Sequence, residues 1–230
     1  TVAYIHIKKE YTLLETSNLT TVYQDGKYLV VTLKDINGNN ISNANVTFRL
    51  NNETFVRTTN SSGQASLYVD LLPKQYNARI LFEGNDKYYN SYADATITIN
   101  RLGTVLSASN ITTVYGKGRY LIANLTDVNG TPIDNVTVFI RLNNETYNMT
   151  TNGSGQVSMF VDLLPKVYYA KITFDGDDRY INSYVNVPVV VNKLATQLNA
   201  TPIATVYGKG KYLVANLTDA DGNPIDNVAV

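Results

Sequence analysis

The sequence contains no cysteine and a single histidine, His6. Without cysteine the chain cannot form a disulfide framework, a thiolate metal site or a cysteine nucleophile. One histidine also excludes a histidine-based catalytic or zinc constellation. We expect His6 to face solvent, because it lies in YIHIK, a segment that alternates like a strand. The lack of cysteine does not exclude an extracellular location, since prokaryotic surface proteins often fold without disulfides.

Charge is scarce as well, and it is balanced. Only 17% of the residues are charged, and 19 basic and 19 acidic residues give a formal net charge of zero. A zero net charge removes the simplest electrostatic case for nucleic-acid binding or for contact with an anionic membrane. We therefore expect no nucleic-acid partner and no membrane contact from this segment. No apolar run approaches the roughly 18 to 20 residues that span a bilayer, and no secretion signal is visible at Thr1.

One stretch occurs three times at a fixed period. TVYQDGKYLVVTLKD begins at Thr21, TVYGKGRYLIANLTD at Thr113 and TVYGKGKYLVANLTD at Thr205, which sets a repeat of 92 residues. Since the outer repeats are incomplete, we expect the natural chain to be longer. The alternative is strand exchange between subunits of a filament. The predicted organisation is a last strand of a preceding repeat over 1–9, full repeats over 10–101 and 102–193, and the first strands of a third repeat over 194–230.

Apolar residues alternate within each repeat, which predicts strands with one buried face. The inward face of one strand should carry Leu121, Ala123 and Leu125. The equivalent inward sets are Leu29, Val31 and Leu33, and Leu213, Ala215 and Leu217. About seven or eight short strands per repeat, separated by Asn-Gly and Asp-Gly turns, indicate an all-β Greek-key sandwich. A closed barrel would show a similar pattern, and the small unit favours the sandwich.

A tyrosine follows a Leu-Pro corner in both full repeats, as LPKQY and LPKVY. Proline cannot donate to a sheet ladder, so the chain should turn there. We interpret Tyr76 and Tyr168 as tyrosine corners, in which the hydroxyl bonds back to nearby backbone.

Two segments carry a family resemblance: DLLPKVYYAKITFDGDDRYINSY and LTDADGNPIDNVAV. They resemble the bacterial-type immunoglobulin-like (Big) repeats of prokaryotic surface proteins, and the chain is most similar to adhesin-like proteins of methanogenic archaea. The resemblance covers the whole chain. It implies tandem immunoglobulin-like Greek-key β-sandwiches in an extracellular, cell-surface protein that serves as a stalk or an adhesin. In such proteins the adhesive tip can lie elsewhere.

Glycosylation signals of the form Asn-x-Ser/Thr are dense in this sequence. We expect at least one asparagine to carry a glycan, which places the protein at a surface. The alternative is chance in a chain rich in Asn and Thr. The strongest candidates recur between repeats, and they are Asn18, Asn52, Asn60, Asn110, Asn124, Asn144, Asn152 and Asn216. Covalent glycans are the only non-protein groups that we predict.

Acidic loops supply the weak metal candidates. Asp175, Asp177 and Asp178 could offer oxygen ligands to Ca²⁺, as could Asp127, Asp219 and Asp221. Calcium needs several oxygens that converge at once, and the turns do not continue as a calcium-binding loop. We therefore favour a turn-forming role for these residues, with no metal.

The leading hypothesis is a structural one: a stiff stalk or filament whose partners are neighbouring repeats or subunits in a fibre. Direct passage from one repeat to the next, without a flexible linker, favours stiffness. The alternative is an adhesion module that binds glycans, proteins or other cell surfaces through loops at one end of a sandwich. Recognition loops should differ between repeats, whereas NNET occurs in both, which favours the structural role. An enzyme would need a catalytic constellation that this sequence does not offer.

Overall fold

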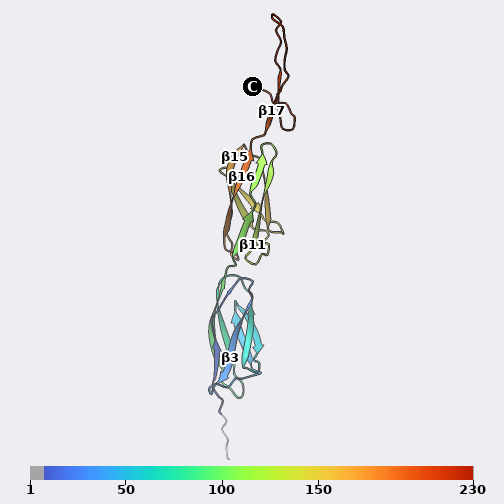
Figure 1. The fold of residues 1–230 in the computed structure, drawn as a ribbon. Coiled ribbons are helices and arrows are strands. Elements are labelled where there is room, and N and C mark those ends of the chain that lie inside the picture. Colours follow the sequence, from blue (N-terminus) through green and yellow to red (C-terminus); the bar gives the residue numbers. More distant parts are fainter. Residues whose placement is uncertain (1–7, 230) are drawn as a thin grey trace, which may run out of the picture. The chain divides into compact units, whose positions relative to one another are not determined.

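The computed structural model describes residues 8–229, and their regular structure consists of β-strands (Figure 1). The described residues contain no helix long and apolar enough to cross a membrane. The chain divides into two compact units. One comprises residues 8–104 with Gly176–Asn182, and the other comprises Val105–Asp175 with residues 183–229. His6 and most of the strand predicted over residues 1–9 lie outside the described residues.

The first unit is a pair of sheets built from eight strands. They are β1 (Thr12–Thr16), β2 (Leu19–Val22), β3 (Lys27–Asp35), β4 (Asn45–Leu50), β5 (Glu53–Thr58), β6 (Gln64–Val69), β7 (Gln75–Phe82) and β8 (Ser91–Asn100). One sheet has the order β1-β3-β6 and the other the order β2-β8-β7-β4-β5. All pairings are antiparallel except that of β2 with β8.

The second unit repeats this arrangement strand for strand. Its strands are β9 (Thr104–Ala108), β10 (Ile111–Val114), β11 (Arg119–Asp127), β12 (Thr137–Leu142), β13 (Glu145–Thr150), β14 (Gln156–Val161), β15 (Lys166–Phe174) and β16 (Ser183–Asn192). The sheet orders are β9-β11-β14 and β10-β16-β15-β12-β13. Two further strands, β17 (Thr196–Ala200) and β18 (Ala215–Asp219), pair only with each other.

The first strand of each repeat is divided between the two sheets. β1 pairs with β3, the chain crosses over at Ser17 and Asn18, and β2 then runs parallel to β8. The side chain of Asn18 completes the crossing, because its Oδ1 accepts a hydrogen bond of 2.9 Å from the backbone N of Thr96. That N–H lies just before the β2–β8 ladder begins, so Asn18 satisfies a donor that the ladder leaves free.

The core of each sandwich lies between its two sheets, and the predicted inward faces of the two full repeats are confirmed. Leu29, Val31 and Leu33 are buried in the first repeat, as are Leu121, Ala123 and Leu125 in the second. Phe48 and Ile140 occupy equivalent positions at the centre of the two cores, and both are fully buried. Each such side chain contributes roughly 1.5–3 kcal/mol by leaving water.

The third copy of the motif does not bury its apolar face. Leu213 is 65% exposed, Ala215 is also exposed and Leu217 is half-buried. Our prediction that these residues face a core is therefore wrong for the described residues. The reason is that β17 and β18 form a two-stranded sheet, and no second sheet packs on it within residues 8–229.

The predicted turns are confirmed by their backbone conformations. Gly38 and Gly130, in the Asn-Gly turns, have φ of 85° and 88°, in the region that glycine alone enters without strain. Asn51 and Asn52, between β4 and β5, both have positive φ, at 52° and 62°. Two consecutive positive φ values match the type I′ hairpin turn, whose twist suits the flanking strands.

Candidate functional site

Each corner tyrosine bonds to the backbone just upstream of it. The hydroxyl of Tyr76 donates to the carbonyl oxygen of Leu72 at 2.9 Å, and Tyr168 donates to that of Leu164 at 2.9 Å. The ammonium groups of Lys74 and Lys166 lie 5.7 and 5.6 Å from the centroids of the rings of Tyr76 and Tyr168. Each corner bond therefore ties the loop before a strand to the first residues of that strand, and both tyrosines are half-buried.

The sequon asparagines are spread over the surface and do not form one site. Seven of the eight candidates are exposed, and Asn124 is half-buried. Asn124 lies on the outer face of β11, as its strand parity predicts, but Gln156 reaches across from β14 and its Nε2 donates to Asn124 Oδ1 at 3.1 Å. This contact explains why the outward position is only partly open.

The turn asparagines accept hydrogen bonds through Oδ1. These bonds do not involve the side-chain nitrogen, which is the atom that would carry a glycan. Oδ1 of Asn60 accepts from the backbone N of Ser62 at 2.9 Å and of Gln64 at 3.0 Å. Asn152 makes the same pair of bonds, at 2.9 and 3.0 Å, in the second repeat. The side-chain nitrogen is the atom to which an N-glycan is attached. These turns are therefore compatible with a glycan and do not require one.

Among the acidic loop residues, Asp177 accepts hydrogen bonds from its own loop. Oδ1 of Asp177 accepts from the backbone N of Arg179 at 2.7 Å and of Tyr180 at 2.8 Å, and Oδ2 lies 3.3 Å from Arg179 Nη2. In the described part of the chain, no group of three His, Cys, Asp or Glu residues is arranged to hold a metal ion. Asp175 and Asp178 are exposed.

The turn aspartates act in the same way. Oδ1 of Asp35 accepts from the backbone N of Asn37 and of Asn39, both at 2.9 Å, and Oδ2 accepts from Asn39 Nδ2 at 2.9 Å. These donors, with the Asn39 amide first, lower the pKa of Asp35 below its ordinary value. Asp127 accepts from the backbone N of Asn129 and Thr131 in the equivalent turn, at 2.8 and 2.9 Å.

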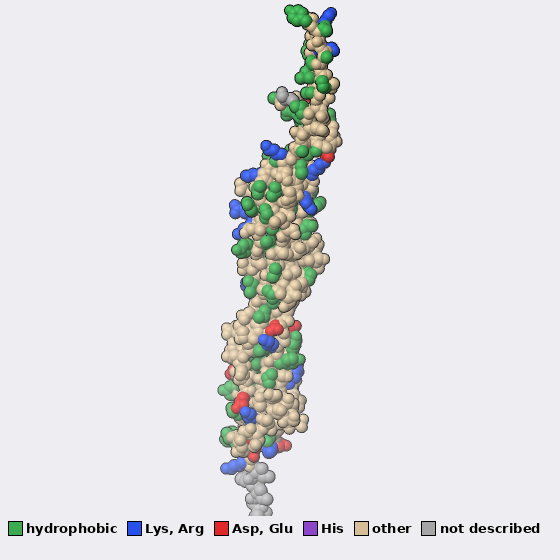
Figure 2. Space-filling view, viewed as in Figure 1, with side chains coloured by type: hydrophobic (Ala, Val, Ile, Leu, Met, Phe, Trp, Pro, Cys, Tyr) green, Lys and Arg blue, Asp and Glu red, His purple; other side chains and the backbone are tan. Residues whose placement is uncertain are grey.

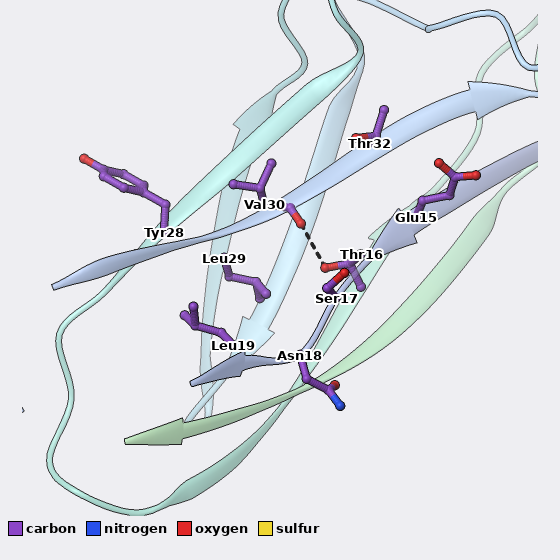
Figure 3. A pocket seen from close by; sticks show the side chains of 9 residues that line it. All are labelled: Glu15, Thr16, Ser17, Asn18, Leu19, Tyr28, Leu29, Val30 and Thr32. Carbon is purple, nitrogen blue, oxygen red and sulfur yellow. Dashed lines mark hydrogen bonds between the residues drawn. The ribbon is translucent and has the colours of Figure 1, made fainter. Parts of the chain in front are cut away.

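One open groove lies where β1 passes into β2 (Figure 3). Its volume is about 400 Å³, and Leu19 and Leu29 form its apolar part. The hydroxyl of Thr16 bridges the two strands by donating to the carbonyl oxygen of Val30 at 2.9 Å, whereas the ring of Tyr28 extends away from the groove. Glu15, the carboxylate at its edge, is paired with Lys34 at 2.6 Å. The groove thus offers no pair of free acids for catalysis.

A second kind of groove recurs at the same place in both repeats, beside the corner tyrosine. We name it the corner groove. In the first repeat it includes Arg49, Lys74 and Tyr76, and in the second it includes Arg141, Lys166 and Tyr168. The sequence did not reveal it, because its basic residues come from strands that are adjacent only once the register is known. The outward parity of Arg49 on β4 and of Arg141 on β12 was the one available signal.

Neither a protein-family model nor a curated protein matches the chain. Among solved structures, the chain is similar to invasin, a bacterial integrin-binding protein, with 15% identity, coverage of 95% of this chain and 48% of that chain, and a TM-score of 0.53. Both repeats are immunoglobulin-like β-sandwiches. The chain thus spans about half the length of the invasin chain.

Two further adhesins also match, at lower TM-scores. A bacterial 1.5-MDa ice-binding adhesin is 14% identical, with 84% of this chain and 70% of that chain covered, at a TM-score of 0.36. The adhesin InvE of Yersinia pseudotuberculosis is 15% identical, with 76% and 58% covered, at a TM-score of 0.37.

Proposed function

We propose that this chain is part of the stalk of an adhesin-like protein on the outer surface of a cell. The observation that carries the proposal is that the two full repeats copy their turns as well as their cores. The corner bonds of Tyr76 and Tyr168 have the same length, and the turns at Asn60 and Asn152 have the same two bonds. Repetition of the loops favours a structural role, because loops that recognise partners diverge.

The alternative, recognition through loops at one sandwich end, has less support. The turns at Asp35, Asn60 and Asp177 direct their polar side chains at their own backbone. Groups that are already bonded in this way would have to break those bonds to hold a ligand. The likeness to invasin supports an adhesin-like surface protein, and the proposed partners of this segment are neighbouring repeats or subunits of a fibre.

The surface location and the glycans belong to the same proposal. The sequon asparagines that recur between repeats are exposed in seven of eight cases, as glycosylation requires. Glycans would also help to keep a chain with so few charges in solution. The similarity to archaeal adhesin-like proteins rests on the sequence motifs and remains a prediction.

Pulling on single molecules tests the stalk function. Each repeat holds 92 residues, so its unfolding should release on the order of 300 Å of chain, at ~3.3–3.6 Å per residue. We expect two unfolding events of equal length at comparable forces, since a stalk must carry load in every repeat. Extension without discrete events, or a single event for the whole chain, would contradict the proposal.

A further inference from the structure

The corner groove of the second repeat gathers three cations. Arg141 on β12 and Lys171 on β15 are exposed on the outer face of the five-stranded sheet, and Lys166 is exposed at the start of β15, beside Tyr168. The groove has a volume of about 410 Å³, and none of the described residues that line it carries a carboxylate. Figure 2 shows Lys and Arg side chains along the side of this unit where Figure 1 labels β15.

Two of these cations stand directly opposite each other in the sheet. Arg141 is the cross-strand partner of Lys171 in the β12–β15 register. Like charges in that position destabilise a sheet. The ion pairs formed by described residues include neither of the two. Lys171 lies over the ring of Tyr184, at 5.6 Å from its centroid, but no ion pair among the described residues neutralises the repulsion, which a bound anion would relieve.

The first repeat has the same pair and compensates for it. Arg49 stands opposite Arg79, but Asp94 on β8 is the next neighbour of Arg79. Asp94 accepts two hydrogen bonds from the Arg79 guanidinium, at 2.8 and 2.9 Å, which hold the pKa of Asp94 below its ordinary value. In the second repeat, Asn186 takes the place of that aspartate beside Lys171. The carboxylate that neutralises the cation pair of the first repeat thus has no counterpart at position 186 of the second.

The rest of the lining has the character of a sugar-binding surface. Tyr169 is 72% exposed, Tyr168 forms the corner, and Asn143 presents an amide at the hairpin turn. Amphipathic rings offer an apolar face and a polar edge. Amides can both donate to and accept from hydroxyl groups. Guanidinium and ammonium groups form charge-assisted bonds to carboxylates.

We propose that the corner groove of the second repeat binds a stretch of acidic polysaccharide, a chain of sugars that carry carboxylates. The carboxylates would meet Arg141, Lys166 and Lys171, and a sugar ring would pack on Tyr169. A cleft lined by one sign of charge concentrates the field at the ligand. A flat anionic bilayer cannot enter a concave groove, and a chain of zero net charge lacks the broad basic surface that nucleic acid needs.

Polysaccharide bound in the groove would contact the side of the repeat, and the stalk function does not require this contact. Loss of polysaccharide binding would therefore leave the proposed stalk intact, and the two proposals fail in different experiments.

Calorimetric titration of the whole chain, produced without N-glycans, with a short oligogalacturonate tests the proposal. The oligogalacturonate should bind, and its fully methyl-esterified form, which has no charge, should not. Binding should weaken as salt is added. Equal binding of the ester, or no binding of the acid, would overturn the proposal. Tighter binding of duplex DNA or of anionic phospholipid vesicles would also overturn it and would assign the groove to another polyanion.

Three variants locate the site. Lys171→Ala and Asn186→Asp should each lower the affinity by about three- to fivefold, the effect of one exposed charge. Asn186→Asp restores the residue of the first repeat at an exposed position, so it carries the test even where an alanine variant fails to fold. Asp94→Asn, the matched change in the first repeat, is the control and should leave the affinity of the second-repeat groove unchanged. Unchanged affinity in Asn186→Asp would contradict the proposed site.

Discussion

The hydroxyl of Tyr76 donates a hydrogen bond to the carbonyl oxygen of Leu72, 2.9 Å away, and Tyr168 repeats the bond to Leu164 at the same distance 92 residues later. The bond spans four residues across a proline-containing corner. It fixes the entry of the chain into β7 and β15, the central strands from which the corner grooves are built. Because the bond recurs at the same length, we infer that the corner has the same structural role in both full repeats.

Removal of the corner hydroxyl should destabilise each repeat by the same amount. Tyr76→Phe and Tyr168→Phe keep the ring and lose the donor, so each should lower the free energy of unfolding of its repeat by about 1 kcal/mol. Urea unfolding measures the loss. Tyr212→Phe is the control, because that ring is 93% exposed and the change should have little effect. A corner variant as stable as the parent would show that the bond contributes nothing.

Two glycines with positive φ should respond differently to substitution. Gly130 has open space where a Cβ would lie, whereas a Cβ on Gly155 would stand 2.3 Å from the carbonyl oxygen of Leu125. Gly130→Ala should cost about 1–2 kcal/mol, the price of a left-handed residue alone. Gly155→Ala should cost more, because a buried backbone must move. Denaturant unfolding of the two variants compares them, and equal losses would contradict the packing at Leu125.

Acid should lower the stability of the first repeat, in part because Asp35 becomes protonated. Its pKa is lowered from 3.8 in the folded chain, chiefly by the Asn39 amide. A lowered carboxyl pKa contributes stability that is present above the ordinary value and is lost as the pH falls through the folded value. We therefore expect stability to fall below about pH 4, and Asn39→Ala to show a smaller fall.

The control for this experiment is Asn37→Ala. Asn37 bonds to Asp35 through its backbone N, which the substitution keeps. Urea unfolding at neutral and acid pH should give Asn37→Ala the pH dependence of the parent. If Asn39→Ala and the parent lost equal stability in acid, the Asn39 amide would not be the main cause of the shift.

Glycan mapping of the native protein should rank the sequons by exposure. Peptides that contain the exposed turn residues Asn52, Asn60, Asn144 and Asn152 should carry sugar mass before the peptide with Asn124, which is half-buried and bonded to Gln156. Mass spectrometry of glycopeptides measures the occupancy. A native mass equal to that of the bare sequence would refute the glycan proposal.

Much of the fold follows from local patterns in the sequence. A period of two is enough to assign Leu121, Ala123 and Leu125 to the core, and Asn-Gly is enough to place a positive φ at Gly38 and Gly130. Both patterns extend over only a few residues, so they can be recognised without knowledge of the tertiary structure. The predicted burial of the third copy is wrong because burial of Leu213 requires a second sheet, which a local pattern does not reveal.

The corner groove depends on long-range register, which local patterns do not contain. Strand parity alone places Arg141 and Lys171 on an outer face, but only the β12–β15 alignment sets them opposite each other. The partial burial of Asn124 has the same origin, since Gln156 reaches it from another strand. Local sequence patterns determine the strands, whereas pairing between distant strands determines the candidate site.

Small-angle X-ray scattering of the whole chain tests the stalk most directly. Repeats of ~40 Å each, joined without bending, would give a radius of gyration on the order of 30 Å and the scattering of a rod. A compact particle of 230 residues would have a radius of gyration of about 17 Å. The stalk model predicts the rod. A compact particle, or the scattering of freely bending domains, would contradict it.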